Sequence, residues 1–280
     1  MKTVQGSLAI EGNTLNLDQV TALLEGKVVV GDKVEVQEVL NAISVYQGLP
    51  DYDPYSLDEL LRAHGEMMGS LVERAGLWRK DNVGIVKGKV VSHVAPPADR
   101  VHHLMGELFE FLKDEEAHPL VIGCVFHYEL EFIHPFEDGN GRIGRFWHSL
   151  LLYHYHPVFE FIPVESLIKD HQQEYYAALE SSDRSGDSTA FVEFSLGVIH
   201  EALVGFLHEL KIVTLTGEDR LEISRRHFGK EPFSRKDYLN HFKTISTATA
   251  SRDLKLGVDL GLLVKEGERA QTSYRYAESV

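Results

Sequence analysis

The chain has 280 residues, of which 43% are hydrophobic, enough for one large core or for a core with a small additional module. Its formal net charge is −15, and its single cysteine, Cys124, excludes an intrachain disulfide. Residues 221–280 carry 11 Lys and Arg against 8 Asp and Glu, a net of +3, which leaves −18 on the first 220 residues. The large acidic part is therefore not expected to bind nucleic acid non-specifically, and the asymmetry predicts two units with different partners.

The sequence shows no targeting or membrane-spanning pattern. Residues 1–6 lack the apolar region of a signal peptide, and the apolar run over residues 119–126 is too short to cross a bilayer. Cys124 lies in that run, where a packing role is expected. These features predict a cytoplasmic protein without membrane contact.

Helical periodicity dominates the chain from its N-terminus to about residue 212. Asn16 or Asp18 is predicted to cap a short helix that ends at Leu24, and Ser56 with Glu59 has the capping-box pattern of a later helix. The predicted helices cover residues 16–24, 34–46, 56–74, 99–112, 119–132, 141–153, 164–179 and 189–212. Such a chain is mostly α.

Two segments depart from this pattern. The β-branched stretch 83–95 is divided by Lys87-Gly88, which predicts a β-hairpin. The C-terminal stretch predicts a helix over residues 235–242, a second over 247–260 and a two-stranded wing over 263–276. This order is that of a winged helix, often used on DNA, and resembles the tails of many bacterial proteins of the family named below.

The predicted winged-helix domain, residues 216–280, has two interpretations. Its second helix carries Arg252 and Lys255 as cations against Asp253 and Asp259. Affinity for phosphate grows with the number of available cations. The domain is therefore a candidate DNA-binding unit, with contacts to protein alone as the alternative.

The most informative segment is the string His-Pro-Phe-Glu-Asp-Gly-Asn-Gly-Arg-Ile-Gly-Arg over residues 134–145. His134 has a side chain suited to proton transfer near neutral pH, so it is a candidate general base. Asp138 offers the hard oxygen ligand that Mg²⁺ prefers. Phe136 is expected to anchor this loop in the core.

The second half of the string suits an anion. Gly139 and Gly141 allow a sharp turn and let backbone N–H groups approach phosphate at the start of a helix that begins near Asn140. Arg142 and Arg145 are three residues apart, so both can project from one face of that helix. The whole string predicts a site that binds a nucleotide polyphosphate and transfers part of it. A plain Asn-Gly turn before a basic helix is the alternative.

The string matches every fixed position of H-x-F-x-[DE]-G-N-G-R-x-x-R and so resembles the signature of the Fic family. The resemblance implies a Fic-type helical core over residues 31–215 and transfer of AMP from ATP to a Ser, Thr or Tyr hydroxyl of a target protein. It assigns the general base to His134 and Mg²⁺ to Asp138. It assigns the nucleotide to Gly139, Asn140, Gly141, Arg142 and Arg145.

A second resemblance lies at the N-terminus. Ser7-Leu-Ala-Ile-Glu11-Gly12 matches the inhibitory pattern [ST]-x-x-x-E-[GN] of Fic proteins. The resemblance implies an inhibitory helix within residues 1–30, in which Glu11 pairs with Arg145 where the γ-phosphate should lie. A solvated Glu11 on an ordinary helix is the alternative.

Two further segments resemble Fic proteins. Ser92, His93 and Val94 lie in the hairpin, which in the family is a flap that pairs with an extended stretch of the target. Tyr176 and Leu179 lie on the helix that helps to form the adenine pocket, although an aromatic pair at helical spacing is also typical of plain core. Asp183 stands where some relatives have Asn.

The leading prediction is an autoinhibited protein adenylyltransferase that uses ATP and Mg²⁺ and also modifies itself. One alternative within the family is transfer of another phosphate-containing group, and another is the reverse reaction, removal of AMP. A third is a DNA-binding regulator whose core only senses nucleotide. The target protein is unknown, and a homodimer is a candidate assembly.

Overall fold

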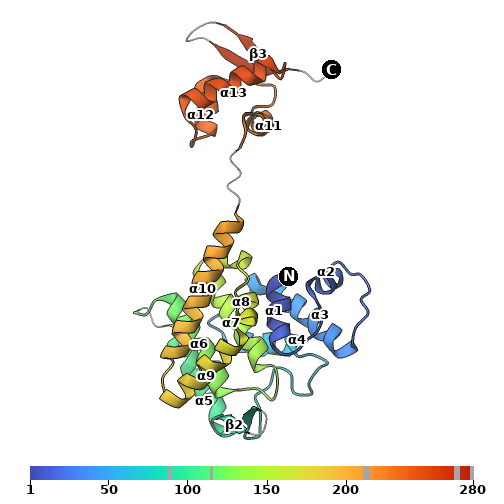
Figure 1. The fold of residues 1–280 in the computed structure, drawn as a ribbon, viewed down its shortest axis with the longest axis vertical. Coiled ribbons are helices and arrows are strands. Elements are labelled where there is room, and N and C mark those ends of the chain that lie inside the picture. The colour runs from blue at the N-terminus through green and yellow to red at the C-terminus, as the bar shows by residue number, and fades with distance from the viewer. Residues whose placement is uncertain (88–89, 114–115, 211–214, 268–271, 278–280) are drawn as a thin grey trace. The chain divides into compact units, whose positions relative to one another are not determined.

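The computed structural model describes the chain except residues 88–89, 114–115, 211–214, 268–271 and 278–280. The chain forms two compact units, Met1–Leu210 and Lys211–Val280 (Figure 1). Most of the described residues are helical, so the predicted mostly α class, with a hairpin in the first unit, is confirmed.

Helices build the first unit. They are α1 Lys2–Ile10, α2 Leu17–Leu24, α3 Lys33–Gln47, α4 Leu57–Met67, α5 Val101–Phe111, α6 Pro119–Ile133, α7 Asn140–Tyr155, α8 Val164–Asp170, α9 Gln172–Ser185 and α10 Thr189–Glu209, with short 3₁₀ turns η1 Leu49–Asp51, η2 Ala98–Arg100 and η3 Pro157–Phe161. The predicted caps are present, since Asn16 closes a full capping box on α2 and Ser56 accepts a hydrogen bond from the Glu59 amide.

The centre of this unit is the antiparallel pair α6 and α7. Phe126 and Leu130 of α6 pack with Phe146 and Trp147 of α7 in the main core, and all four are fully buried. The Trp147 indole donates to the carbonyl of Pro54 at 3.2 Å, so burial leaves its one polar atom bonded. The signature loop joins these two helices and is therefore mounted on the main core of the unit.

Two smaller cores flank the centre. One lies among α8, α9 and α10 and includes Tyr175 and Phe191. The other joins α1 to α2 and α3 through residues such as Val4, Leu8 and Val39. The N-terminal helix is thus a packed element of the first unit, beside α3 and α8 (Figure 1).

Two predicted helices differ from the observed ones. The helix predicted over residues 56–74 ends at Met67. The side-chain Nδ2 of Asn41 donates to the carbonyls of Met67 and Gly69, and Ser70 then adopts a left-handed φ of 63°. The helix predicted over residues 164–179 is two helices, α8 and α9, which meet at His171.

The predicted hairpin is present. Strand β1, Gly84–Lys87, pairs antiparallel with β2, Val90–Val94, with Gly84 opposite Val94 and a bulge between Ile85 and Val86. Both strands are edges, so the hairpin can accept a further strand.

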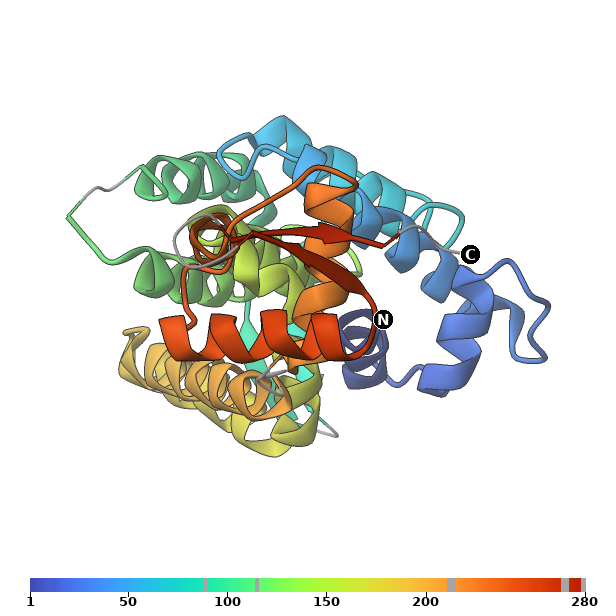
Figure 2. The ribbon, with the colours of Figure 1, turned by 90° about the horizontal axis from the view of Figure 1, so that it is seen from above.

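The second unit has helices α11 Gly217–Phe228, α12 Arg235–His241 and α13 Thr247–Asp259, followed by strands β3 Leu263–Glu266 and β4 Ser273–Tyr276. Figure 2 shows the antiparallel strands beside α13. The two predicted helices and the hairpin are in place, and α11 was missed although Thr216 and Asp219 form its capping box. Its classification as a winged helix stays a prediction.

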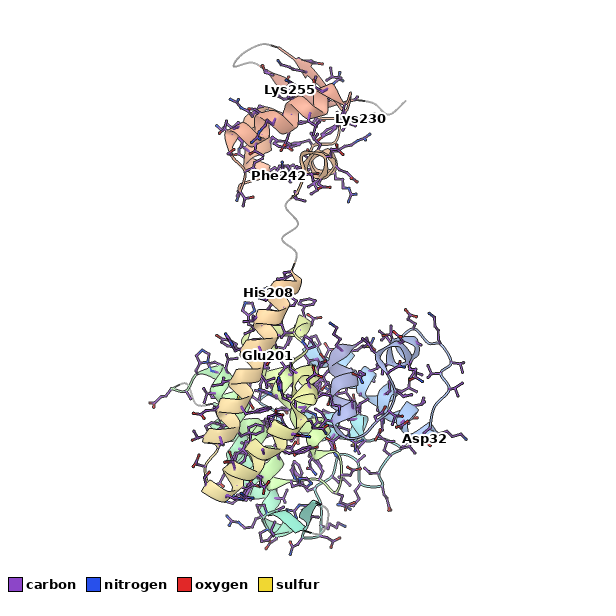
Figure 3. All side chains as sticks on the ribbon, in the orientation of Figure 1. Asp32, Glu201, His208, Lys230, Phe242 and Lys255 are labelled. Carbon is purple, nitrogen blue, oxygen red and sulfur yellow. The ribbon has the colours of Figure 1, made fainter. Side chains whose placement is uncertain are left out.

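Asp253 does not carry the role that its position in the sequence suggests. It is 4% exposed and forms a bidentate pair with Arg220, at 2.6 and 2.9 Å, which ties α13 to α11. Arg252, Lys255 and Asp259 are exposed (Lys255 is labelled in Figure 3). The outer face of α13 is therefore more basic than the sequence count indicates.

Helix α10 is the one described helix that could cross a membrane by length and composition, over Thr189–His208. Phe191, Val198, Ile199 and Ala202 of this helix belong to the core of the first unit. The share of the apolar segment that is buried inside the first unit is 28%.

The buried histidines should make the free energy of unfolding depend on pH under mildly acidic conditions. Burial lowers the pKa of His64 to about 4 and those of His127 and His148 to about 3. In the unfolded chain these histidines bind protons below pH ~6.5. In the native state they stay neutral down to a lower pH. The free energy of unfolding should fall as the pH is lowered from about 6.5 to 5, by about 1.4 kcal/mol per pH unit for each such histidine. Urea titrations at several pH values measure this slope.

Glu165 acts in the opposite direction, because burial raises its pKa to about 7 and the native state takes up its proton first. His148→Phe should lessen the slope by about one proton. His208→Phe, the same change on the exposed end of α10 (Figure 3), should leave it unchanged. Equal slopes for His148→Phe and the parent would contradict the assignment.

Candidate functional site

The catalytic candidate His134 stands where α6 ends. Its backbone is left-handed, with φ 49°, an uncommon conformation for a residue with a side chain. Its Nδ1 lies 3.4 Å from the carbonyl of Glu131, which favours the proton on Nδ1 and places the lone pair on Nε2. Nε2 is then the atom that can accept a proton from a substrate.

The loop after His134 is anchored as predicted by Phe136, which is fully buried. The ring of Phe136 stacks on His64 with centroids 3.6 Å apart and planes 5° apart. The Asn140 side chain closes the loop, since its Oδ1 accepts from the Phe136 amide and its Nδ2 donates to the Phe136 carbonyl, both at 2.9 Å. Asn140 therefore supports the loop, and its predicted contact with nucleotide stays a prediction.

His64 is a site residue that the sequence did not reveal. Its Nδ1 accepts a hydrogen bond from the Gly76 amide at 2.8 Å, so its Nε2 carries the proton and donates to the carbonyl of Asp138 at 2.9 Å. Burial keeps it neutral with a pKa of about 4. A neutral imidazole from α4 thus fixes the backbone of the predicted metal ligand.

Asp138 fits the predicted Mg²⁺ site. Its side chain is 61% exposed, and its Oδ1 accepts from the Gly139 amide at 2.6 Å and from Arg142 at 3.1 Å. Among the described residues no group of three or more His, Cys, Asp or Glu could hold a metal ion. One carboxylate is the usual protein contribution where phosphates and water complete the shell of Mg²⁺.

The turn into α7 depends on glycine. Gly139 is the N-cap, with φ +83°, and a Cβ there would lie 2.6 Å from the sulfur of Met68. The helix begins at Asn140, as predicted, and its first amides and positive dipole end face the approach of an anion.

Arg145 is held by the N-terminal helix. It is 1% exposed, its Nε donates to Ser7 Oγ at 3.1 Å, and its Nη2 donates to the Ser7 carbonyl at 3.1 Å and to Glu11 Oε1 at 2.6 Å. Burial would lower the pKa of Arg145, but nearby acidic groups, Glu11 first, raise it above its ordinary value. The predicted pair of Glu11 and Arg145 is present.

Glu11 also covers the start of α7. A Cβ at Gly141 would lie only 2.4 Å from Glu11 Oε1 and 2.9 Å from Arg145 Nη1. The carboxylate therefore lies against bare backbone at a helix N-terminus, a position suited to a phosphate oxygen. Glu11 is the C-cap of α1, and Gly12 follows with φ +95°, which turns the chain away from the site.

Arg142 has a comparable partner that the sequence did not reveal. Its Nη1 donates to Glu38 of α3 at 2.7 Å, and its Nη2 to Asp138 at 3.1 Å. Glu38 in turn accepts a hydrogen bond from the side-chain Nδ2 of Asn13 at 2.9 Å. Both arginines are thus bonded to carboxylates, and Asn13 links the partner of Arg142 to the chain just after Glu11.

Close backbone contact seats α1. A Cβ at Gly6 would lie 2.8 Å from both the backbone N and the Cα of Ser166 in α8, so only glycine fits there. The Ser166 hydroxyl donates to the Lys2 carbonyl, and the side-chain Nε2 of Gln172 donates to the Ile10 carbonyl. These bonds and the burial of Leu8 fix Glu11 over the site.

The remaining predicted residues lie in strand β2 and helix α9. Ser92, His93 and Val94 are in strand β2, with Val94 73% exposed. Tyr176 and Leu179 are on α9, the former 36% exposed and the latter partly buried. Asp183 accepts a hydrogen bond from the hydroxyl of Tyr128. Their roles at a flap and an adenine pocket stay predictions.

Comparison with known proteins agrees with this site. The model of the Fic/DOC family matches residues 54–152, which include the whole signature. A solved Fic family protein from Desulfovibrio desulfuricans is 38% identical and superposes with a TM-score of 0.72 over 100% of this chain and 86% of that one. The Fic-1 fragment from Caenorhabditis elegans is 26% identical over 74% of this chain and 63% of the fragment, with a TM-score of 0.60.

Curated relatives carry an activity in their names. The protein adenylyltransferase Fic of Nematostella vectensis is 29% identical over 81% of this chain and 53% of that protein. The protein adenylyltransferase fic-1 of Caenorhabditis elegans is 32% identical over 68% of this chain and 38% of that protein. The chain thus spans about half or less of these two relatives. By its signature and its full-length structural match, it belongs to the Fic family.

The contact between Gly6 and Ser166 predicts that one methyl group unseats α1. Gly6→Ala places a Cβ against backbone that cannot rotate away, so α1 should detach without any change to Glu11. Amide hydrogen exchange over residues 2–11 should become at least tenfold faster. Gly106→Ala, in α5 with no atom near its would-be Cβ, should leave that exchange unchanged. Unaltered exchange in Gly6→Ala would show that α8 yields instead.

Proposed function

We propose that the chain is a protein adenylyltransferase that is inhibited by its own N-terminal helix. The observation that carries the proposal is the position of Glu11, which occupies both Arg145 and the start of α7. An anion site closed by a carboxylate from another helix is what competition with a triphosphate requires. The names of the relatives support AMP as the transferred group.

In the proposed reaction the triphosphate lies over the start of α7. Amides of the first turn hold the α-phosphate, and Arg142 and Arg145 bind the β- and γ-phosphates. Mg²⁺ held by Asp138 supplies charge neutralisation on the phosphates. His134 Nε2 accepts the proton of a target hydroxyl, whose oxygen bonds to the α-phosphorus. The bond to the bridging oxygen breaks, and pyrophosphate leaves with the electron pair.

Inhibition follows from exchange of counter-ions at the two arginines. Arg145 is buried, so its charge needs an anionic partner in either state. Glu11 is that partner in the closed state, and the γ-phosphate replaces it in the active one. Arg142 must likewise exchange Glu38 for phosphate. The bond between Asn13 and Glu38 couples the two exchanges, because both change when the segment after α1 moves.

Release of Glu11 is the first test. Glu11→Gly should raise incorporation of label from α-³²P-ATP into the chain or into a lysate protein by tenfold or more, because the γ-phosphate can then reach Arg145. His134→Ala in the same background should abolish the label. Mass spectrometry should locate AMP on a Ser, Thr or Tyr.

The matched control is Glu25→Gly. Glu25 is also an acidic C-cap, that of α2, but it is exposed and pairs with Lys27, outside the signature. It should label at the parent rate. Labelling that is equal in Glu11→Gly and the parent would remove the inhibitory role. Label that persists in His134→Ala would remove the general base. Gly6→Ala should activate as Glu11→Gly does, through loss of the seated helix.

The same site leaves room for related chemistry. Removal of AMP would use Glu11 to orient water, and this reaction remains an alternative proposal from the family resemblance. A cytoplasmic location and a homodimer also stay predictions.

DNA binding by the second unit is a second candidate function, favoured by the burial of Asp253. Because Asp253 is buried in its pair with Arg220, the exposed charged residues of α13 are Arg252, Lys255 and Asp259. A helix that follows a turn and presents cations is the usual reader of the DNA major groove.

Mobility shifts with a double-stranded DNA pool test this candidate. Binding should weaken as salt is raised from 50 to 200 mM, and Arg252→Ala with Lys255→Ala should weaken it about tenfold. Arg226→Ala with Lys243→Ala removes the same charge from elsewhere in the unit and is the control. Equal binding by the two double variants would mean non-specific attraction, and no shift at low salt would remove the function.

A further inference from the structure

Arg79 is a buried cation whose partners are carbonyl oxygens. It is 2% exposed, and no carboxylate of the described residues lies within ion-pair distance of it. Burial lowers its pKa. A buried charge is costly unless it is fully hydrogen-bonded. The hydrogen bonds that Arg79 makes should therefore indicate its role.

The carbonyls that it binds belong to two different parts of the site. Arg79 Nε donates to the His134 carbonyl at 2.8 Å, Nη2 approaches that of Ile133 at 3.4 Å, and the backbone amide donates to that of Pro135 at 2.9 Å. These contacts grip the backbone on both sides of the candidate base. They also explain how His134 keeps a left-handed φ, because such a conformation persists only where its surroundings over-determine it.

The other partners are the two ends of the hairpin. Nη1 donates to the Asp81 carbonyl at 2.7 Å, just before β1, and Nη2 donates to the Pro96 carbonyl, just after β2. Two further bonds close the base of the hairpin, from the Ala95 amide to the Val83 carbonyl and from the Ala98 amide to the Asn82 side chain. One planar guanidinium therefore joins the base of the hairpin to the backbone of His134.

We propose that Arg79 is a positioning residue that fixes the hairpin in register with His134, so that a hydroxyl presented along the hairpin meets the general base. The inference rests on the proposed function. Only arginine offers donors in several directions from one rigid plane, so lysine cannot hold both parts at once. A displacement of about 1 Å between reacting groups is enough to cost about 10²-fold in rate.

Hydrogen exchange tests the linkage apart from the chemistry. Arg79→Lys should speed amide exchange in two separate segments, residues 94–98 and 133–136, while exchange in α7 stays at the parent rate. Arg62→Lys, the same change at an exposed position of α4, should alter neither segment. Faster exchange in only one segment, or in neither, overturns the proposal whether or not the protein transfers AMP.

Kinetics in the Glu11→Gly background test the consequence. Arg79→Lys should lower the rate of self-labelling at saturating ATP about 10²-fold, with the dissociation constant of ATP changed by less than twofold. Arg79→Ala should regain part of its rate in millimolar guanidinium chloride, provided that its thermal melt shows a folded protein. A normal rate for Arg79→Lys, or a loss of ATP affinity that matches the loss of rate, contradicts a positioning role. Absence of labelling in the Glu11→Gly parent would instead contradict the proposed function.

Discussion

The ion pair between Glu11 and Arg145 is the contact on which the organisation of the site depends. Arg145 is buried, and a buried guanidinium needs a carboxylate or a phosphate beside it. The protein supplies the carboxylate from its own N-terminus. The charge of Arg145 is therefore paired, and in the proposed mechanism a phosphate of the nucleotide would replace Glu11 beside it.

Around this pair the fold separates rigid from replaceable parts. The loop from His134 to Gly139 is held by groups that nucleotide would not displace: the Asn140 side chain, neutral His64 and the Arg79 guanidinium. The two arginines are held by Glu11 and Glu38, which nucleotide would displace. In the proposed reaction the backbone that carries His134 would therefore be in place before substrate binds, and only Arg142 and Arg145 would have to change partners.

The sequence was sufficient for the parts of the site that are contiguous. The spacing from His134 to Arg145, the glycine turn and the start of α7 all follow from local backbone chemistry. It was insufficient for His64, Arg79 and Glu38, because each reaches the loop from a distant element and none has a distinctive neighbour in the chain. The same limit applies to Asp253, whose burial follows from its pair with Arg220 in another helix. Pairing across helices is a tertiary property, and local propensity does not encode it.

The bare backbone at Gly6 has a consequence for the proposed inhibition. Where the backbones of two helices are in direct contact, there is no room even for one methyl group between them. A larger side chain there would push α1 away from α8 and, under the proposed function, would loosen Glu11 from Arg145 while every residue of the site keeps its chemical identity. Under the proposed function, the strength of inhibition would then depend on steric fit at a residue that takes no part in the reaction.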